Sequence, residues 1–191
     1  MTTNTTMKVP LLDLRAQYDT IRAEVDDAVR GVMESCHFIG GPEITGLESE
    51  VARYSQSAHA VACASGTDAI LLALWVLGIG PGDEVICPSY TFFATAGTVA
   101  NNGATPVFLD VDPKTYNIDT HLLEAAITPR TKAVVAVSLF GQCADIPAIK
   151  AVCDKHQLFL IEDAAQSIGS EWEGKRSGSQ CDFGTFSFFP S

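Results

Sequence analysis

The sequence has little positive charge: 12 Lys and Arg residues stand against 23 Asp and Glu residues, which gives a formal net charge of −11. A nucleic-acid groove needs a basic stripe that displaces counterions, and an anionic membrane surface attracts clustered Lys and Arg. We therefore expect neither nucleic acid nor a membrane as a partner. A small anionic ligand stays compatible with this charge, because the N-terminus of a helix binds phosphate without any basic side chain.

Several motifs are also missing. The six cysteines form no CxxC pair and the four histidines form no HExxH pattern, so we expect reduced thiols in a cytoplasmic protein and no metal site. The first ten residues contain no apolar core of a signal peptide, and the longest apolar run, residues 69–80, is too short to cross a bilayer. No GxGxxG or GxxxxGK[ST] loop follows an expected strand, which disfavours a simple nucleotide-binding domain.

Apolar residues are plentiful, at 47% of the chain, and their spacing changes along it. Residues 11–35 have helical periodicity, and a Gly-Gly-Pro turn and a helix over 44–54 follow. From there short β-rich runs alternate with helical stretches. Strands are expected at 60–64, 84–88, 105–112, 132–140, 158–163 and 183–189, and the main helices between them at 68–77, 92–101 and 145–157. This alternation predicts an α/β fold with a mostly parallel sheet that is covered on both faces.

Ligands of such sheets bind at the carboxyl ends of the strands, and two polar groups fall there. Ser65-Gly66-Thr67 opens a helix, where backbone N–H groups favour an anion; an ordinary N-cap by Ser65 or Thr67 explains the same residues. Asp163 ends the apolar strand LFLIED, and a buried carboxylate needs a partner. That partner is either the protonated ring nitrogen of a cofactor, a helix start or a buried cation.

Aromatic residues and a hydroxyl lie near the same edge. Phe92 and Phe93 follow the strand that ends near Ser89, and an aromatic ring there either stacks on a flat cofactor or belongs to the core. Ser187 lies among aromatics in TFSFFP. Its hydroxyl needs a partner if it is buried, and both a phosphate and a backbone carbonyl would serve.

Six short motifs occur in one order along the chain. They are SGTDAI (65–70), PSYTFFAT (88–95), DVDPKTYNID (110–119), LFGQCAD (139–145), EDAAQSIG (162–169) and FGTFSFFPS (183–191). In order and spacing they resemble the DegT/DnrJ/StrS-type sugar aminotransferases, which are pyridoxal-5′-phosphate (PLP) enzymes with the aspartate-aminotransferase fold. The resemblance covers the chain from about Pro10 and includes the FIGGPE turn at 38–43.

This resemblance implies an α/β, aspartate-aminotransferase-like architecture (PLP fold type I). Residues 1–40 would form an N-terminal helical arm, and residues 41–191 the major part of the PLP-binding large domain, with its sheet wrapped by helices. In the family, SFFPS is followed directly by the lysine that forms the Schiff base. No lysine of this chain occupies that place. We therefore expect the chain to be the first half of a longer protein, incomplete at its C-terminus and without the small domain.

The resemblance also implies roles for the candidate residues. Asp163 would pair with the pyridine nitrogen of PLP, and Gln166 would lie near its phenolic oxygen. Phe92 would stack on the ring, with Phe93 as the alternative. The phosphate would be held by the segment Ser65, Gly66 and Thr67, with Ser187 adding a further donor.

The function that the resemblance implies is transfer of an amino group from an amino acid, with glutamate as the expected donor, to a nucleotide-linked keto sugar. Homodimers with shared active sites are usual in the family, so a second copy of the chain is an expected partner. Two related functions stay open. A histidine in place of the lysine would indicate a PLP-dependent sugar dehydratase, and the absence of turnover would indicate a regulator that binds PLP or sugar.

Overall fold

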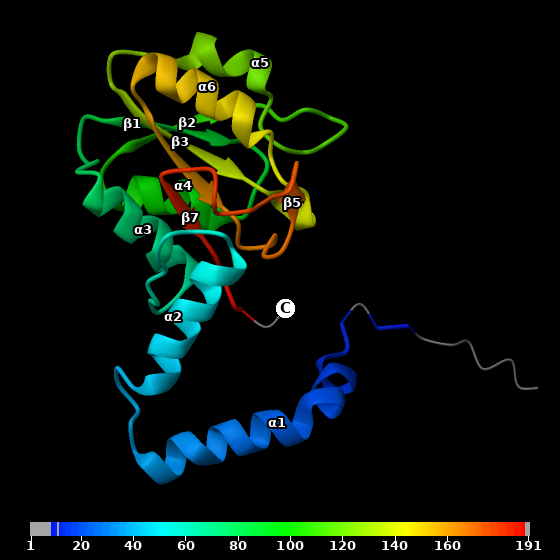
Figure 1. The fold of residues 1–191 in the computed structure, drawn as a ribbon. Coiled ribbons are helices and arrows are strands. Elements are labelled where there is room, and N and C mark those ends of the chain that lie inside the picture. The colour runs from blue at the N-terminus through cyan, green and yellow to red at the C-terminus, as the bar shows by residue number, and fades with distance from the viewer. Residues whose placement is uncertain (1–8, 11, 190–191) are drawn as a thin grey trace, which may run out of the picture. The chain divides into compact units, whose positions relative to one another are not determined.

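The computed structural model describes residues 9–10 and 12–189, and the chain divides into two units (Figure 1). One unit comprises the residues up to Thr45 together with the end of the chain from Phe189, and the other comprises Gly46–Phe188. The predicted division at residue 40, into an arm and a PLP-binding domain, stays a prediction.

The N-terminal unit contains helix α1 (Leu14–Ser35), as the periodicity of residues 11–35 predicts. The helix begins where the carboxylate of Asp13 accepts a hydrogen bond from the N–H of Ala16 at 3.0 Å, which is a side-chain N-cap. It ends at Cys36 in a left-handed backbone conformation. No residue of α1 is buried.

The larger unit is built on a parallel sheet. Its strands are β1 (Glu84–Pro88), β2 (Thr105–Leu109), β3 (Thr131–Val137), β4 (Phe159–Asp163) and β7 (Phe183–Thr185). Their order is β2-β1-β3-β4-β7, and every neighbouring pair is parallel. The predicted mostly parallel α/β sheet is therefore confirmed.

Helices cover both faces of this sheet, as Figure 1 shows: α5 (Thr120–Leu123) and α6 (Ile146–His156) lie on one side, and α3 (Gly66–Val76) and α4 (Phe93–Asn101) on the other. Successive strand residues point to opposite faces. Thus Ile86, Val134 and Leu160 join the core under α6, and Val85, Val135 and Ile161 join the core under α3 and α4. This alternation explains why the strands are apolar along their whole length.

Two expected strands differ from the structure. Residues 60–64 form no strand, because no described strand pairs with them, and Val61 is 81% exposed. The strand expected over 183–189 ends at Thr185, because Thr185 pairs with Asp163, the last residue of β4. Beyond that point β4 offers no further backbone groups to continue the ladder.

A hairpin that the sequence reading missed follows the carboxyl end of β4. Strands β5 (Glu171–Trp172) and β6 (Lys175–Arg176) pair around Glu173 and Gly174, both at positive φ, as a two-residue hairpin turn requires. The turn EG between two short polar strands is a weak signal, because neither strand contains the apolar alternation that predicts a buried sheet.

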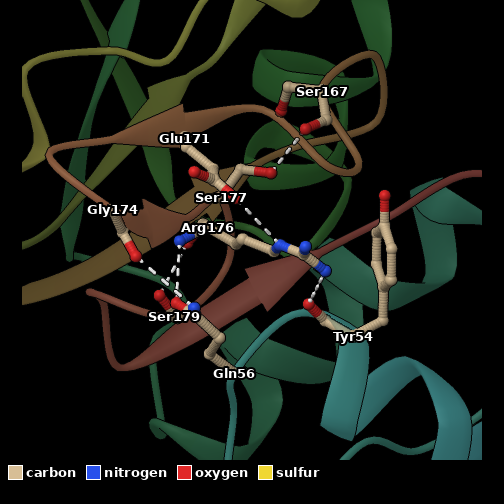
Figure 2. Close-up of polar contacts among 8 residues, drawn as sticks. All are labelled: Tyr54, Gln56, Ser167, Glu171, Gly174, Arg176, Ser177 and Ser179. Carbon is tan, nitrogen blue, oxygen red and sulfur yellow. Dashed lines mark hydrogen bonds and ion pairs between the residues drawn. The ribbon is translucent and has the colours of Figure 1, made fainter.

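Arg176 fastens this hairpin to the end of helix α2 (Pro42–Tyr54), as Figure 2 shows. Its Nη1 donates to the carbonyl oxygen of Tyr54 at 2.6 Å, its Nε donates to Glu171 at 3.1 Å, and its guanidinium lies 4.1 Å from the centre of the Tyr54 ring. The next residue, Ser177, donates from its hydroxyl to the carbonyl oxygen of Ser167 at 2.5 Å. The hairpin therefore holds the segment that follows Asp163.

We expect Arg176→Lys to lower the free energy of unfolding by about 1–2 kcal/mol, because an ammonium group cannot keep both donated bonds and the stacking on Tyr54. Denaturant unfolding of the complete gene product, with whatever follows Ser191, measures this. The control is Arg30→Lys, whose pair with Asp27 is 62% and 73% exposed and should change stability by less than about 0.5 kcal/mol. Equal effects of the two substitutions would contradict the anchoring role of Arg176.

Candidate active site

Asp163 is a buried carboxyl group at the carboxyl end of β4. Asp163 is only 6% exposed. Its Oδ2 accepts a hydrogen bond from Thr95 Oγ1 at 2.7 Å, and its Oδ1 accepts one from the N–H of Ala165 at 3.3 Å. Burial raises the pKa of Asp163 above its usual value, and the two donors oppose that rise. No ion pair in the described part of the chain includes Asp163, so the explanation as a buried ion pair is wrong there.

Glu162 lies beside Asp163 in sequence and on the other face of the sheet, as the alternation along a strand predicts. Its carboxyl accepts from Ser138 Oγ at 2.6 Å and from the N–H of Gly178 at 2.6 Å, and burial raises its pKa. Both donors belong to backbone turns that follow or flank the sheet. Glu162 thus connects the segments of Ser138 and Gly178 on one face of the sheet, whereas Asp163 faces α4 on the other face.

The start of helix α3 brings two predicted residues together. A Cβ placed on Gly66 would lie 2.8 Å from Cβ of Ser187 and 3.2 Å from the carbonyl oxygen of Phe186. Only glycine therefore allows these segments to approach so closely. Ser65 is the N-cap of α3, and its hydroxyl accepts from the N–H of Asp68 at 3.1 Å. The N-cap explanation of Ser65 is therefore confirmed, while Gly66 and Thr67 occupy the first turn, where N–H groups have no acceptor within the helix.

The two phenylalanines are both at the surface of the described chain. Phe92 is the N-cap residue of α4 and is 72% exposed, and Phe93 is 83% exposed, so their explanation as core residues is wrong. The Phe93 ring lies against Gly97 of its own helix, where a Cβ would come within 2.6 Å of it. Phe92 has an extended backbone just before the helix, and its stacking on a cofactor ring stays a prediction.

Gln166 follows Asp163 by three residues and connects two strand ends. Its Oε1 accepts from the N–H of Phe140 at 3.0 Å, just after β3. Phe140 has a left-handed backbone at φ 56°, an unusual conformation for an aromatic residue. The bond to Gln166 helps to hold this conformation at the edge of the candidate site.

The larger unit has hollows that Asp163 does not line, and two of them are described by their lining residues. One, of about 410 Å³, lies beside Tyr54 and Arg176. The other, of about 570 Å³, lies at the ends of β1 and β2, and it is lined by Ser89, Tyr90, Asp110, Val111, Pro113 and Tyr116. The described residues include no group of three or more His, Cys, Asp or Glu placed to hold a metal ion.

Thr95 is the site residue that sequence reasoning missed. It is fully buried, on the first turn of α4, and it donates the shortest bond that Asp163 receives. It lies within the motif PSYTFFAT, four residues after Thr91. That spacing places both hydroxyls on one side of a helix start, which is the only signal in the sequence that could have indicated it.

The family follows from comparison with known proteins. Residues 19–191 match the DegT/DnrJ/EryC1/StrS aminotransferase family, and the chain belongs to this family. It is 51% identical, over all of its length and 51% of the relative's, to the UDP-N-acetyl-3-dehydro-alpha-D-glucosamine 3-aminotransferase of Acidithiobacillus ferrooxidans. It is 49% identical, over 97% of its length and 50% of the relative's, to a pleiotropic regulatory protein of Geobacillus stearothermophilus.

A solved structure agrees with this assignment. The crystal structure of DesV from S. venezuelae, in complex with a ketimine intermediate, matches with a TM-score of 0.94 at 46% identity, over 97% of this chain and 50% of that one. The predicted fold, PLP fold type I, is therefore confirmed. The chain spans about half the length of the relatives that it matches.

We expect Gly66→Ala to destabilise the complete gene product by about 1–3 kcal/mol, because the new methyl group would overlap Ser187 and the Phe186 carbonyl. Denaturant unfolding without added cofactor measures the change. Gly46→Ala is the matched control: Gly46 lies inside α2 with no atom within 4 Å of the new Cβ, and alanine there should stabilise by about 0.5–1 kcal/mol. A neutral Gly66→Ala would show that the two segments do not meet.

The raised pKa of Asp163 predicts that the free energy of unfolding depends on pH. Because the folded state binds the Asp163 proton more tightly than the unfolded state, the stability from Asp163 is fully present below about pH 3.8 and is lost as pH rises through the folded pKa. The asparagine side chain of Asp163→Asn does not ionise, so the variant lacks this pH-dependent loss of stability. Its amide oxygen still accepts a bond from Thr95. Thermal unfolding of the cofactor-free protein should therefore show the variant gaining on wild type between pH 4 and pH 8. A difference that is constant with pH would contradict the burial of an ionisable Asp163.

Proposed function

We propose that the complete protein is a PLP-dependent aminotransferase that moves an amino group from an amino acid, with glutamate as the expected donor, to the keto group of a nucleotide-linked sugar. The observation that carries the proposal is the buried Asp163 carboxyl, which has hydroxyl and amide donors but no cationic partner among the described residues. The names of relatives support the reaction class, because one is a 3-aminotransferase of a UDP-linked keto sugar.

The donors and acceptors of the candidate site fit PLP in their chemistry. A buried carboxyl at the carboxyl edge of the sheet suits a protonated pyridine nitrogen. The first turn of α3, which Gly66 allows to approach Ser187 closely, suits a phosphate, because N–H groups at a helix start are free to bind an anion. Phe92 would cover one face of the ring, and Gln166 would donate from Nε2 to the ring's phenolic oxygen while its Oε1 keeps the bond from the N–H of Phe140.

When bound, PLP supplies an electron sink for the carbanion at the substrate carbon. Asp163 holds a proton on the ring nitrogen, and its own charge is stabilised by the bond from Thr95. The burial of Asp163 excludes water and strengthens that pairing. The helix start and Ser187 would fix the phosphate and thereby hold the ring in one position.

Proton transfer between the two carbons needs a base, and we assign none to it among the described residues. The Schiff-base lysine that the family resemblance implies directly after Ser191 would provide both the covalent anchoring of PLP and that proton transfer. A histidine at that place would change the assignment to a sugar dehydratase.

The protein is proposed to act as a homodimer in the cytoplasm. Large exposed apolar side chains near the site, Phe92 and Phe93 among them, support an additional chain that covers them. All six cysteines are free thiols, which supports a reducing compartment.

A regulator that binds PLP without turnover is the second candidate, because one relative at 49% identity is named a pleiotropic regulatory protein. The two functions share the cofactor site. They differ in whether an amino group is released to a keto sugar.

The test is borohydride reduction of the complete gene product followed by peptide mass mapping, together with an aminotransfer assay on UDP- and dTDP-linked keto sugars. We expect a pyridoxyl group on a lysine that follows Ser191, and turnover that Asp163→Asn lowers at least about 100-fold while the circular dichroism spectrum is unchanged. A pyridoxyl adduct without turnover on any sugar would favour the regulator. Neither adduct nor turnover would reject the proposed function.

A further inference from the structure

Two threonine hydroxyls and the Asp163 carboxyl form a hydrogen-bonded chain at the start of α4. Thr91 Oγ1 lies 3.0 Å from Thr95 Oγ1, and Thr95 Oγ1 lies 2.7 Å from Asp163 Oδ2. Thr95 is fully buried and Thr91 is half-buried. The chain therefore runs from the surface to the buried acid within one helical turn.

The directions of these bonds depend on the charge of Asp163. An ionised carboxylate only accepts, so Thr95 must donate its single proton to Asp163. The Thr95 oxygen is then left as an acceptor, and Thr91 donates to it. All three groups are satisfied in this arrangement, and each bond polarises the next. The hydroxyl chain thus favours the ionised form of Asp163 and opposes the rise of its pKa that burial causes.

The bond from Thr95 also fixes the orientation of the carboxyl group. Thr95 donates to Oδ2 at 2.7 Å, whereas the bond that Oδ1 accepts from the N–H of Ala165 is longer, at 3.3 Å. Oδ1 is therefore the oxygen with the weaker existing bond, and it suits a strong additional donor such as a protonated ring nitrogen.

We infer that Thr95, oriented by Thr91, is a positioning residue that stabilises the carboxylate of Asp163 by its hydrogen bond and presents Oδ1 of Asp163 to the cofactor's ring nitrogen. This inference rests on the proposed function. Nothing in the relatives' names assigns a role to either threonine, and neither would touch substrate or the reacting atoms.

Thr98, on the same helix, provides a matched control for a purely structural role of Thr95. Thr98 is 3% exposed, and its hydroxyl has no hydrogen-bond partner among the described residues. Thr95→Val and Thr98→Val thus make the same change of a buried hydroxyl to a methyl group three residues apart. Only the first of them removes a bond to Asp163. Thr95→Ser keeps the hydroxyl and serves as the rescue variant.

Two other titratable groups lie close enough to Asp163 to matter for a pH profile. Cys87, at the end of β1, is buried with a pKa of about 12, and Glu162 is on the opposite face of β4 with a raised pKa. Cys87 stays neutral across the working range. Glu162 is common to all three threonine variants, so its titration cancels in the comparison.

The test measures kcat, KM and the pH dependence of kcat for wild type and the three threonine variants of the complete gene product with PLP. We expect Thr95→Val to lower kcat about 10-fold with KM within about 3-fold, and to shift the acid limb of the kcat profile to higher pH, because Asp163 then ionises less readily. Thr95→Ser should recover most of the rate. Thr98→Val should leave both rate and profile unchanged.

A Thr95→Val enzyme with the rate and acid limb of Thr98→Val would overturn the inference, even if its stability were lower. A second measurement separates this failure from a failure of the proposed function. In the cofactor-free protein, unfolding free energies of Thr95→Val, Asp163→Ala and the double variant form a thermodynamic cycle, because alanine, unlike asparagine, cannot accept the bond from Thr95. If wild type shows no aminotransfer, the proposed function fails, and non-additivity in the cycle still supports the coupling of Thr95 to Asp163, whereas additivity overturns it.

Discussion

Burying a carboxyl group at the end of a parallel strand costs free energy unless another group compensates its charge. In this protein Asp163 is buried at the carboxyl end of β4 with a hydroxyl and an amide as its only donors in the described chain. The compensation is therefore partial, and the raised pKa of Asp163 reflects it. A cationic ligand beside such a group would complete the compensation. This difference supports the proposed pairing of Asp163 with a protonated ring nitrogen.

The rest of the larger unit keeps Asp163 in this environment. Helices on both faces exclude water from β4, and the alternation of side chains sends Glu162 to one face and Asp163 to the other. Glu162 collects donors from the turns around it, and the hairpin fastened by Arg176 holds the segment that follows. At the other side of the site, Gly66 lets the start of α3 approach Ser187. Asp163 and the predicted anion site at the start of α3 thus both lie near the carboxyl ends of β4 and β7.

Much of this could be predicted from the sequence, because the information is local. The runs VVAV and LFLI are apolar at every position, which indicates strands covered on both faces, and the sheet contains both. Strand ends that depend on a distant partner could not be predicted in this way. Residues 60–64 have strand composition but no partner in the described chain, and residues 186–189 extend past the end of β4.

The residues of the candidate site also divide into those that local sequence predicts and those that depend on a distant contact. Asp163, Gly66 and Ser187 follow from the position of motifs relative to strand ends, and the structure places Gly66 against Ser187. Thr95 is different, because its importance depends on a contact with a residue 68 positions away. A buried threonine in a helix is indistinguishable in sequence from its neighbour Thr98, which bonds to nothing among the described residues. Only the fold separates the two.

The most direct measurement is a crystal structure of the complete gene product grown with PLP. The account predicts the ring nitrogen within hydrogen-bond distance of Asp163 Oδ1, the phosphate at the first turn of α3 beside Ser187, and Thr95 still bonded to Oδ2. A cofactor bound elsewhere, or one whose ring nitrogen faces a group other than Asp163, would contradict it.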